Sequence, residues 1–164
     1  SALLVGADGV IRDVYDKNLL IPFTEYVPLA DLGGTWLERF AGASEFAAAE
    51  AVPALRFGAW RISTPICYEA VRPAFVRRMV LEADPNLIAT LANDSWFGDS
   101  QEAELHLAMA EMRAIEHRRF LVRATNIGIS AVVAPVGREL VRSGLLTREN
   151  LRAFFNDTAT TEIY

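Results

Sequence analysis

Cysteine and histidine are scarce in this sequence. Its 164 residues include one cysteine, Cys67, and two histidines, His106 and His117. A single cysteine excludes an intramolecular disulfide and any multi-cysteine metal site, and we expect neither a metal nor a cofactor. The two histidines stand in one expected helix about 16 Å apart along its axis, so they cannot both serve one cysteine.

Long apolar runs and an excess of positive charge are also missing. No stretch reaches the roughly 18 to 20 uninterrupted apolar residues of a membrane-spanning helix, and the first residues show no signal-peptide pattern. The 16 Lys and Arg residues against 21 Asp and Glu give a formal net charge of -5, which disfavours nucleic acid as a partner. Taken alone, the sequence predicts a domain without a transmembrane segment.

What the sequence does contain is a regular alternation of short apolar runs and helical patterns. Hydrophobic residues make up 52% of it, which suits a buried sheet covered by helices. The patterns predict strands at 1–5, 10–15, 55–57, 59–66, 86–92, 120–125, 130–134 and 139–142. They predict helices at 72–82 and 101–117, with a further short helix at 31–40. This order favours the α/β class.

Two of these elements carry expectations about burial. In the helix at 101–117, the apolar residues Leu105, Ala108, Met112 and Ile115 recur at the spacing of one face. Such a stripe is typical of a helix face that packs on a core. The strand at 86–92 is apolar almost throughout, which is typical of a strand buried on both faces.

Cys67 stands where an apolar strand gives way to a polar turn. A lone cysteine is most often a small buried hydrophobe, and its position alone favours that interpretation. The functional alternative is a thiolate nucleophile at a strand-to-helix elbow, where backbone N–H groups stabilise the thiolate and an oxyanion. Because the histidine spacing gives little support to a Cys–His pair, a lysine or glutamate partner has to be considered.

Lys17 and Glu25 are the candidate partners. Lys17 lies between the end of a strand and an apolar run, which is an unusual position for a solvated lysine. Glu25 follows among prolines and aromatic residues, where a carboxylate could be partly buried and paired with Lys17. The ordinary alternatives are a surface lysine that closes a hairpin and an exposed loop glutamate.

Four motifs, in order along the chain, resemble those of the apolipoprotein N-acyltransferases. They are YDKNLLIPFTEYVP at 15–28, ICYE at 66–69, NDSWFGDS at 93–100, and the stretch at 106–130 that ends in RATNIGIS. The first resembles the family pattern YDKxxLVPFGEYVP, and the second resembles its nucleophile motif. The resemblance covers residues 1 to about 150 and favours Cys67 as a nucleophile over Cys67 as a buried hydrophobe.

The resemblance implies a fold and a set of site residues. The family belongs to the nitrilase superfamily, so we expect a nitrilase-like α-β-β-α sandwich over residues 1–150, truncated at its N-terminal side. Residues 151–164 are expected to form a tail, of which 156–164 is not native. The general-base glutamate of the family's triad lies on an earlier strand, outside these 164 residues. The expected catalytic residues are Cys67 as nucleophile, Lys17 for the oxyanion, Glu25 and Glu69, and the expected substrate-binding residues are Tyr68, Trp96 and Phe97.

Other polar residues near the expected site have structural interpretations. Charged side chains on a helix beside an active site usually brace loops through hydrogen bonds. We expect this bracing role for His106, Arg113, His117 and Arg123. For the aromatic pair Trp96 and Phe97, packing in the core is the alternative to contact with an acyl chain.

By this resemblance the reaction is an N-acyl transfer. A phospholipid acyl chain would pass through a cysteine thioester to the N-terminal amine of a diacylglyceryl-cysteine lipoprotein. The implied partners are the phospholipid donor, the apolipoprotein acceptor and the bacterial inner membrane, with the catalytic domain of the full-length protein facing the periplasm. The alternatives are a soluble amidase of the same superfamily and a fragment that is inactive without its general base.

Overall fold

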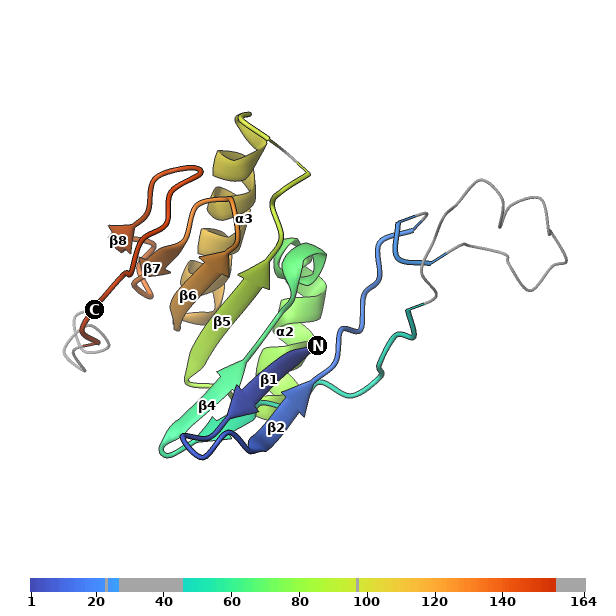
Figure 1. The fold of residues 1–164 in the computed structure, drawn as a ribbon. Helices are drawn as coiled ribbons and strands as arrows, with labels where there is room; N and C mark the ends of the chain where they lie inside the picture. Colours follow the sequence, from blue (N-terminus) through green and yellow to red (C-terminus); the bar gives the residue numbers. More distant parts are fainter. Residues whose placement is uncertain (23, 27–45, 97, 156–164) are drawn as a thin grey trace, which may run out of the picture.

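The computed structural model describes residues 1–22, 24–26, 46–96 and 98–155 and shows an α/β fold (Figure 1). An antiparallel hairpin of two strands precedes a six-stranded sheet with the order β3-β4-β5-β6-β7-β8. The strands are β1 (Ala2–Val5), β2 (Ile11–Tyr15), β3 (Leu55–Phe57), β4 (Trp60–Ser63), β5 (Leu87–Ala92), β6 (Phe120–Thr125), β7 (Ala131–Val133) and β8 (Glu139–Arg142). The helices are the 3-10 helix η2 (Cys67–Val71), α2 (Pro73–Ala83) and α3 (Glu102–His117).

The centre of the sheet is parallel. Strand β4 pairs with β5, and β5 pairs with β6, both in parallel register. Parallel neighbours need crossover connections, and α2 and α3 provide them. Because the strand order follows the chain and such crossovers share one hand, both helices cover the same face of the sheet (Figure 1).

Two apolar clusters hold these elements together. The larger one lies between the sheet and the two helices and includes Val76 of α2, Ile88 of β5 and Leu107 of α3. The smaller one joins the hairpin to α2 and includes Tyr15 of β2 and Met79. Burial of apolar side chains is the main term that stabilises such layers. The hairpin is therefore part of the same packed unit as the helix that follows the cysteine.

The predicted elements agree closely with the observed ones. Every strand and both long helices are present, with bounds that shift by one or two residues. The exception is β4, which ends at Ser63 although the apolar pattern runs to Ile66. The expected short helix at 31–40 lies outside the described residues. Among the described residues, no helix combines the length and the apolar character that spanning a bilayer requires.

The expected packing face of α3 is wrong. Leu105 is 60% exposed, and Met112 and Ile115 are also exposed. The helix instead turns a face of small residues toward the sheet, including Ala110 and Ala114. Small side chains let the helix approach the sheet closely, and His106 on that face lies within hydrogen-bond distance of Asp94 and Arg123. Periodicity identifies an apolar stripe, but it does not tell which face the tertiary structure covers.

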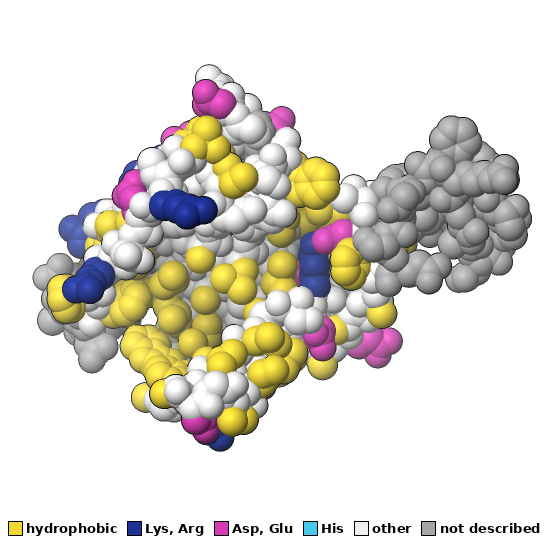
Figure 2. Space-filling model, viewed as in Figure 1, with side chains coloured by type: hydrophobic (Ala, Val, Ile, Leu, Met, Phe, Trp, Pro, Cys, Tyr) yellow, Lys and Arg dark blue, Asp and Glu magenta, His cyan; other side chains and the backbone are white. Residues whose placement is uncertain are grey.

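The expected burial of β5 on both faces is also wrong. Leu91 of β5 is 39% exposed, although Ile88 is fully buried. Ile88 faces the helices, whereas Leu91 lies on the opposite side of the strand. Figure 2 shows hydrophobic side chains gathered in a hollow of the molecule on the side of the sheet that the helices do not cover.

A group of carboxyl side chains joins α3 to β8. Glu104 of α3 binds Arg142 with an Oε1 to Nη2 distance of 2.7 Å, and Glu139 lies 3.3 Å from Arg142 Nη1. Burial raises the pKa of Glu111, the neighbouring carboxyl of Glu139 raises it further, and Arg142 offsets this only in part. The resulting pKa of Glu111 is about 7, against an ordinary value of 4.5.

This raised pKa predicts a loss of stability toward alkaline pH. Between the two pKa values the folded state binds more protons than the unfolded state, so the free energy of unfolding falls as the pH rises from about 5 to 8. Replacing Glu111 by Gln should flatten that dependence and stabilise the fold at pH 8 by about 1 kcal/mol after solvent screening. Urea unfolding at both pH values measures this. Glu102→Gln, an exposed change on the same helix, is the control and should leave the slope unchanged.

Candidate active site

The candidate residues gather at the carboxyl ends of the parallel strands. Cys67 follows β4, Asp94 follows β5, and Asn126 follows β6. Ligand sites of open parallel sheets lie at this edge, because the loops there converge. The loops after β5 and β6 are tied together: Asn126 Nδ2 donates to Asn93 Oδ1 at 2.7 Å, and Asp94 N donates to Asn126 Oδ1 at 3.2 Å.

Cys67 sits on a sharp backbone elbow. Its φ of 50° lies in the left-handed region, which is uncommon for a residue with a side chain. The chain before it is fixed, because Ile66 forms an isolated parallel bridge with Leu91. Cys67 is itself the first residue of η2, and it is half-buried. Strained backbone of this kind is found at active sites, where it aims a side chain.

Glu69 holds the backbone next to Cys67 in place. Its side chain is fully buried and accepts four hydrogen bonds. Oε2 accepts from the Tyr15 hydroxyl at 2.9 Å and from Ile66 N at 2.8 Å. Oε1 accepts from the backbone N–H groups of Asn18 and Leu19 at 2.6 and 3.0 Å. One carboxylate therefore joins the residue before Cys67 to the residues after Lys17.

The other groups around Glu69 reinforce this link. Burial raises the pKa of Tyr15, and the charge of Glu69 raises it further, so the phenol stays protonated and donates to the carboxylate. Asn18 Nδ2 donates to the carbonyl oxygens of Asp16 and Ala51 at 2.9 and 3.0 Å. The segment that carries Lys17 is thus held on both sides.

Lys17 and Glu25 form an ion pair, which is one of the alternatives that the sequence left open. The ammonium lies 2.6 and 2.7 Å from the two carboxylate oxygens, and Ile21 N donates to Oε2 at 2.8 Å. The Lys17 side chain is 11% exposed and that of Glu25 is 22% exposed. Both residues line a cavity of about 550 Å³ that also includes Ile66, the neighbour of the cysteine. Lys17 and the residue before Cys67 therefore border the same cavity.

A second group of charged side chains, formed by Asp94, His106 and Arg123, lies at the same end of the sheet. The sequence did not indicate that these residues would come together. Asp94 Oδ1 is 2.9 Å from His106 Nδ1, and Asp94 Oδ2 accepts from Arg123 Nη2 at 2.7 Å. Burial opposes the charge of Asp94, but the hydrogen bond of His106 and the charge of Arg123 outweigh it and hold its pKa below the usual value. A Cβ at Gly128 would come within 2.0 Å of Asp94 Oδ2, so only glycine fits there.

This group gives His106 and Arg123 the bracing role expected from the sequence. Arg123 Nε also donates to the carbonyl of Ile129 at 3.2 Å, which fixes the loop after β6. Burial lowers the pKa of Arg123, although the charge of Asp94 and the hydrogen bond to Asp94 raise it. The guanidinium is therefore a buried positive charge near Cys67. Arg113 and His117 lie further along α3, beside Glu116.

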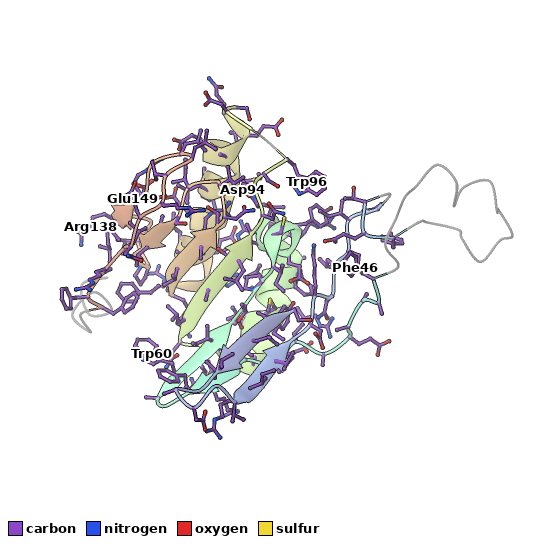
Figure 3. All side chains as sticks on the ribbon, in the orientation of Figure 1. Phe46, Trp60, Asp94, Trp96, Arg138 and Glu149 are labelled. Atoms are coloured by element: carbon purple, nitrogen blue, oxygen red, sulfur yellow. The ribbon has the colours of Figure 1, made fainter. Side chains whose placement is uncertain are left out.

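Of the expected substrate-binding residues, Tyr68, Trp96 and Phe97, the structure describes Tyr68 and Trp96, and these two lie in different surroundings. The Tyr68 hydroxyl accepts from Arg72 Nη1 at 2.6 Å. Trp96 is 73% exposed and stands beyond the end of β5, whereas Asp94 points inward (Figure 3). Phe97 lies outside the described residues. Within the described parts of the chain, no three His, Cys, Asp or Glu side chains are grouped so that they could hold a metal ion.

A cysteine elbow at the carboxyl ends of parallel strands, next to a cavity with a partly buried lysine, is the arrangement of a nitrilase-type α/β domain. The chain belongs to the carbon-nitrogen hydrolase family, whose model matches residues 1–161. An amidase from Nesterenkonia sp. AN1, whose structure shows acrylamide added to the active-site cysteine, has a TM-score of 0.59. It is 24% identical, and the match covers 87% of this chain and 52% of the amidase, which shows the shared fold.

Curated relatives are more similar in sequence. The chain is 39% identical over 140 residues to the apolipoprotein N-acyltransferase of Azotobacter vinelandii, which covers 84% of this chain and 26% of that protein. It is 43% identical over 126 residues to the apolipoprotein N-acyltransferase of Pseudomonas putida, which covers 76% of this chain and 25% of that protein. The chain therefore spans about a quarter of the length of these relatives.

Proposed function

We propose that this chain is the nucleophile-bearing part of an N-acyltransferase that modifies lipoproteins at a bacterial membrane. The observation that carries the proposal is the four-bonded carboxylate of Glu69, which ties the Cys67 elbow to the Lys17 segment. Rigid positioning of a nucleophile against an oxyanion-stabilising cation is what covalent acyl transfer requires. The two named relatives support the same reaction.

In the first step the Cys67 thiolate attacks the carbonyl carbon of a phospholipid acyl ester. The carbonyl oxygen becomes an oxyanion, which Lys17 stabilises together with backbone N–H groups. When the tetrahedral intermediate collapses, the C–O bond breaks and the lysophospholipid alkoxide takes up a proton from solvent, which the acceptor amine returns in the second step. The acyl chain remains on Cys67 as a thioester.

In the second step the free α-amine of a diacylglyceryl-cysteine attacks the thioester. The C–S bond breaks, an amide forms, and the thiolate of Cys67 is regenerated as the amine loses its proton. Glu25 keeps Lys17 in place, and Glu69 acts as a positioning residue since its oxygens are occupied by four donors. We place the reaction at the periplasmic face of the inner membrane, where both substrates would be found.

A soluble amidase is the second candidate, because the family model and the fold are shared with the Nesterenkonia amidase. The test is to incubate the full-length protein with a phospholipid labelled in its acyl chain and a diacylglyceryl-cysteine peptide. N-acylated peptide is the expected product. Release of ammonia from simple amides without acylated peptide would replace the acyltransferase assignment with the amidase.

Replacing Lys17 by Met should slow the acylation of Cys67 by about 10²- to 10³-fold, which is the usual effect of removing one oxyanion donor. The side chain keeps its length but loses the charge, and Glu25 loses its ion-pair partner. Burst kinetics with a chromogenic acyl ester measure the step. Arg56→Met, an exposed change on β3, is the matched control and should leave the rate unchanged. An unaffected burst in Lys17→Met would remove Lys17 from the mechanism.

A further inference from the structure

A second cavity of about 380 Å³ lies beside the one that holds Lys17. The two cavities share Leu20 and Ala48 as lining residues, so they border each other across these side chains. The described lining of the second cavity is mainly apolar or aromatic. It consists of Asn18, Leu19, Leu20, Pro22, Tyr26, Ala48, Tyr68 and Arg72. Among them Arg72 carries the only charge.

Arg72 is held in a defined position over this cavity. Its Nη1 donates to the Tyr68 hydroxyl at 2.6 Å, and its guanidinium lies 5.4 Å from the centre of the Tyr68 ring. Its backbone N–H donates to the carbonyl of Glu69 at 3.1 Å, which ties it to the end of η2. Within the described residues no carboxylate forms an ion pair with Arg72. A positioned guanidinium without a counter-ion is a ready partner for an anion.

We propose that Arg72, held in place by Tyr68, is a specificity-determining residue that binds the phosphate of the acyl donor. This inference rests on the proposed function. The guanidinium presents parallel N–H donors that match two phosphate oxygens. The apolar lining suits the glycerol and acyl carbons that adjoin such a phosphate. Cys67 directly precedes Tyr68 in the chain, so a bound headgroup would bring its ester toward the thiol.

The chemistry of the cavity favours a phosphate-bearing lipid over a free anion. A free phosphate would gain only the contact with Arg72, whereas a lipid also buries carbon against Leu19, Pro22 and Tyr26. A neutral diacylglycerol would gain the apolar contacts but not the charged one. Comparing the lipid phosphate with the diacylglycerol therefore tests the charged contact, and comparing it with free phosphate tests the apolar contacts.

The test is calorimetric titration of the full-length protein in a Cys67→Ala background, so that no ligand is turned over. The probes are 1,2-dihexanoylglycerol 3-phosphate, 1,2-dihexanoylglycerol and inorganic phosphate. We expect the phosphate-bearing lipid to bind about tenfold more tightly than the diacylglycerol, from one charge-assisted contact. Arg72→Met should remove this preference and leave the affinity for the diacylglycerol unchanged. Arg77→Met, an exposed change on α2, is the matched control and should retain the preference.

Three outcomes would overturn the proposal. They are equal binding of the two lipids, equal losses in Arg72→Met and Arg77→Met, and binding of inorganic phosphate with the affinity of the lipid. Because binding is measured without acceptor and without turnover, it is independent of acyl transfer. Failure to acylate a peptide with this preference intact counts against the proposed function alone, whereas transfer without the preference counts against the Arg72 site alone.

Discussion

Replacing Cys67 by Ala is expected to abolish acyl transfer, with a loss of about 10⁴-fold or more, because no other side chain at the site can form the thioester. The same change should alter the free energy of unfolding by less than about 1 kcal/mol. Alanine keeps the Cβ at the left-handed backbone position, and the thiol is only half-buried. Peptide acylation and urea unfolding measure the two effects.

Cys67→Ser separates the chemistry from the shape of the site. Serine has nearly the size of cysteine but is a far weaker nucleophile at neutral pH, so transfer should remain undetectable. Acylated peptide formed at the wild-type rate by Cys67→Ala would assign the reaction to another residue. A fold that fails in Cys67→Ala while Cys67→Ser remains stable would instead assign the cysteine to packing.

Replacing Glu69 by Gln is expected to destabilise the fold by about 2 to 4 kcal/mol, the largest effect on stability for a single atom exchange at this site. The carboxylate accepts four hydrogen bonds, whereas an amide NH₂ would face two donors without accepting from either. Because those donors belong to the Lys17 segment and to Ile66, the rate of transfer should also fall. Urea unfolding and burst kinetics measure the two losses.

Tyr15→Phe provides the graded comparison for Glu69. It removes one of the four donors and leaves the carboxylate in place, so a loss of only about 1 kcal/mol is expected. Its effect on the rate should be small because Asn18, Leu19 and Ile66 still hold Glu69. A Glu69→Gln protein with wild-type stability would contradict the role of this carboxylate as the link between the two halves of the site.

Local patterns were sufficient to predict much of the fold. Apolar runs of strand length and two helical patterns predicted the α/β class and nearly all element bounds. This works because the periodicity of a strand or a helix is visible in the spacing of apolar residues that are close in the sequence. The elbow at Cys67 and the ion pair between Lys17 and Glu25 were among the alternatives that local sequence left open. Position alone favoured a buried hydrophobe at Cys67, and only the resemblance to the apolipoprotein N-acyltransferases favoured a nucleophile there.

Contacts between distant segments were not predictable in the same way. Glu69 binds residues about 50 positions earlier in the chain, and its separation from Asn18 is 51. Asp94 meets Arg123 across 29 positions, so the charged group under the sheet edge had no local signature. The exposure of the apolar face of α3 was not predicted for a related reason. The spacing of apolar residues along a helix identifies an apolar face, but whether another element covers that face depends on the tertiary structure. The roles of Cys67, Lys17, Glu25, Glu69, Tyr68, Trp96 and Phe97 in catalysis and binding stay predictions.

The most direct measurement is the mass of the tryptic peptide that carries Cys67 after the full-length protein meets a phospholipid donor in the absence of an acceptor amine. We predict that this peptide gains the mass of one acyl chain, that hydroxylamine removes it as a thioester, and that adding a diacylglyceryl-cysteine peptide transfers it. An unmodified Cys67 peptide while acylated acceptor accumulates would contradict the central claim that this thiol carries the acyl group.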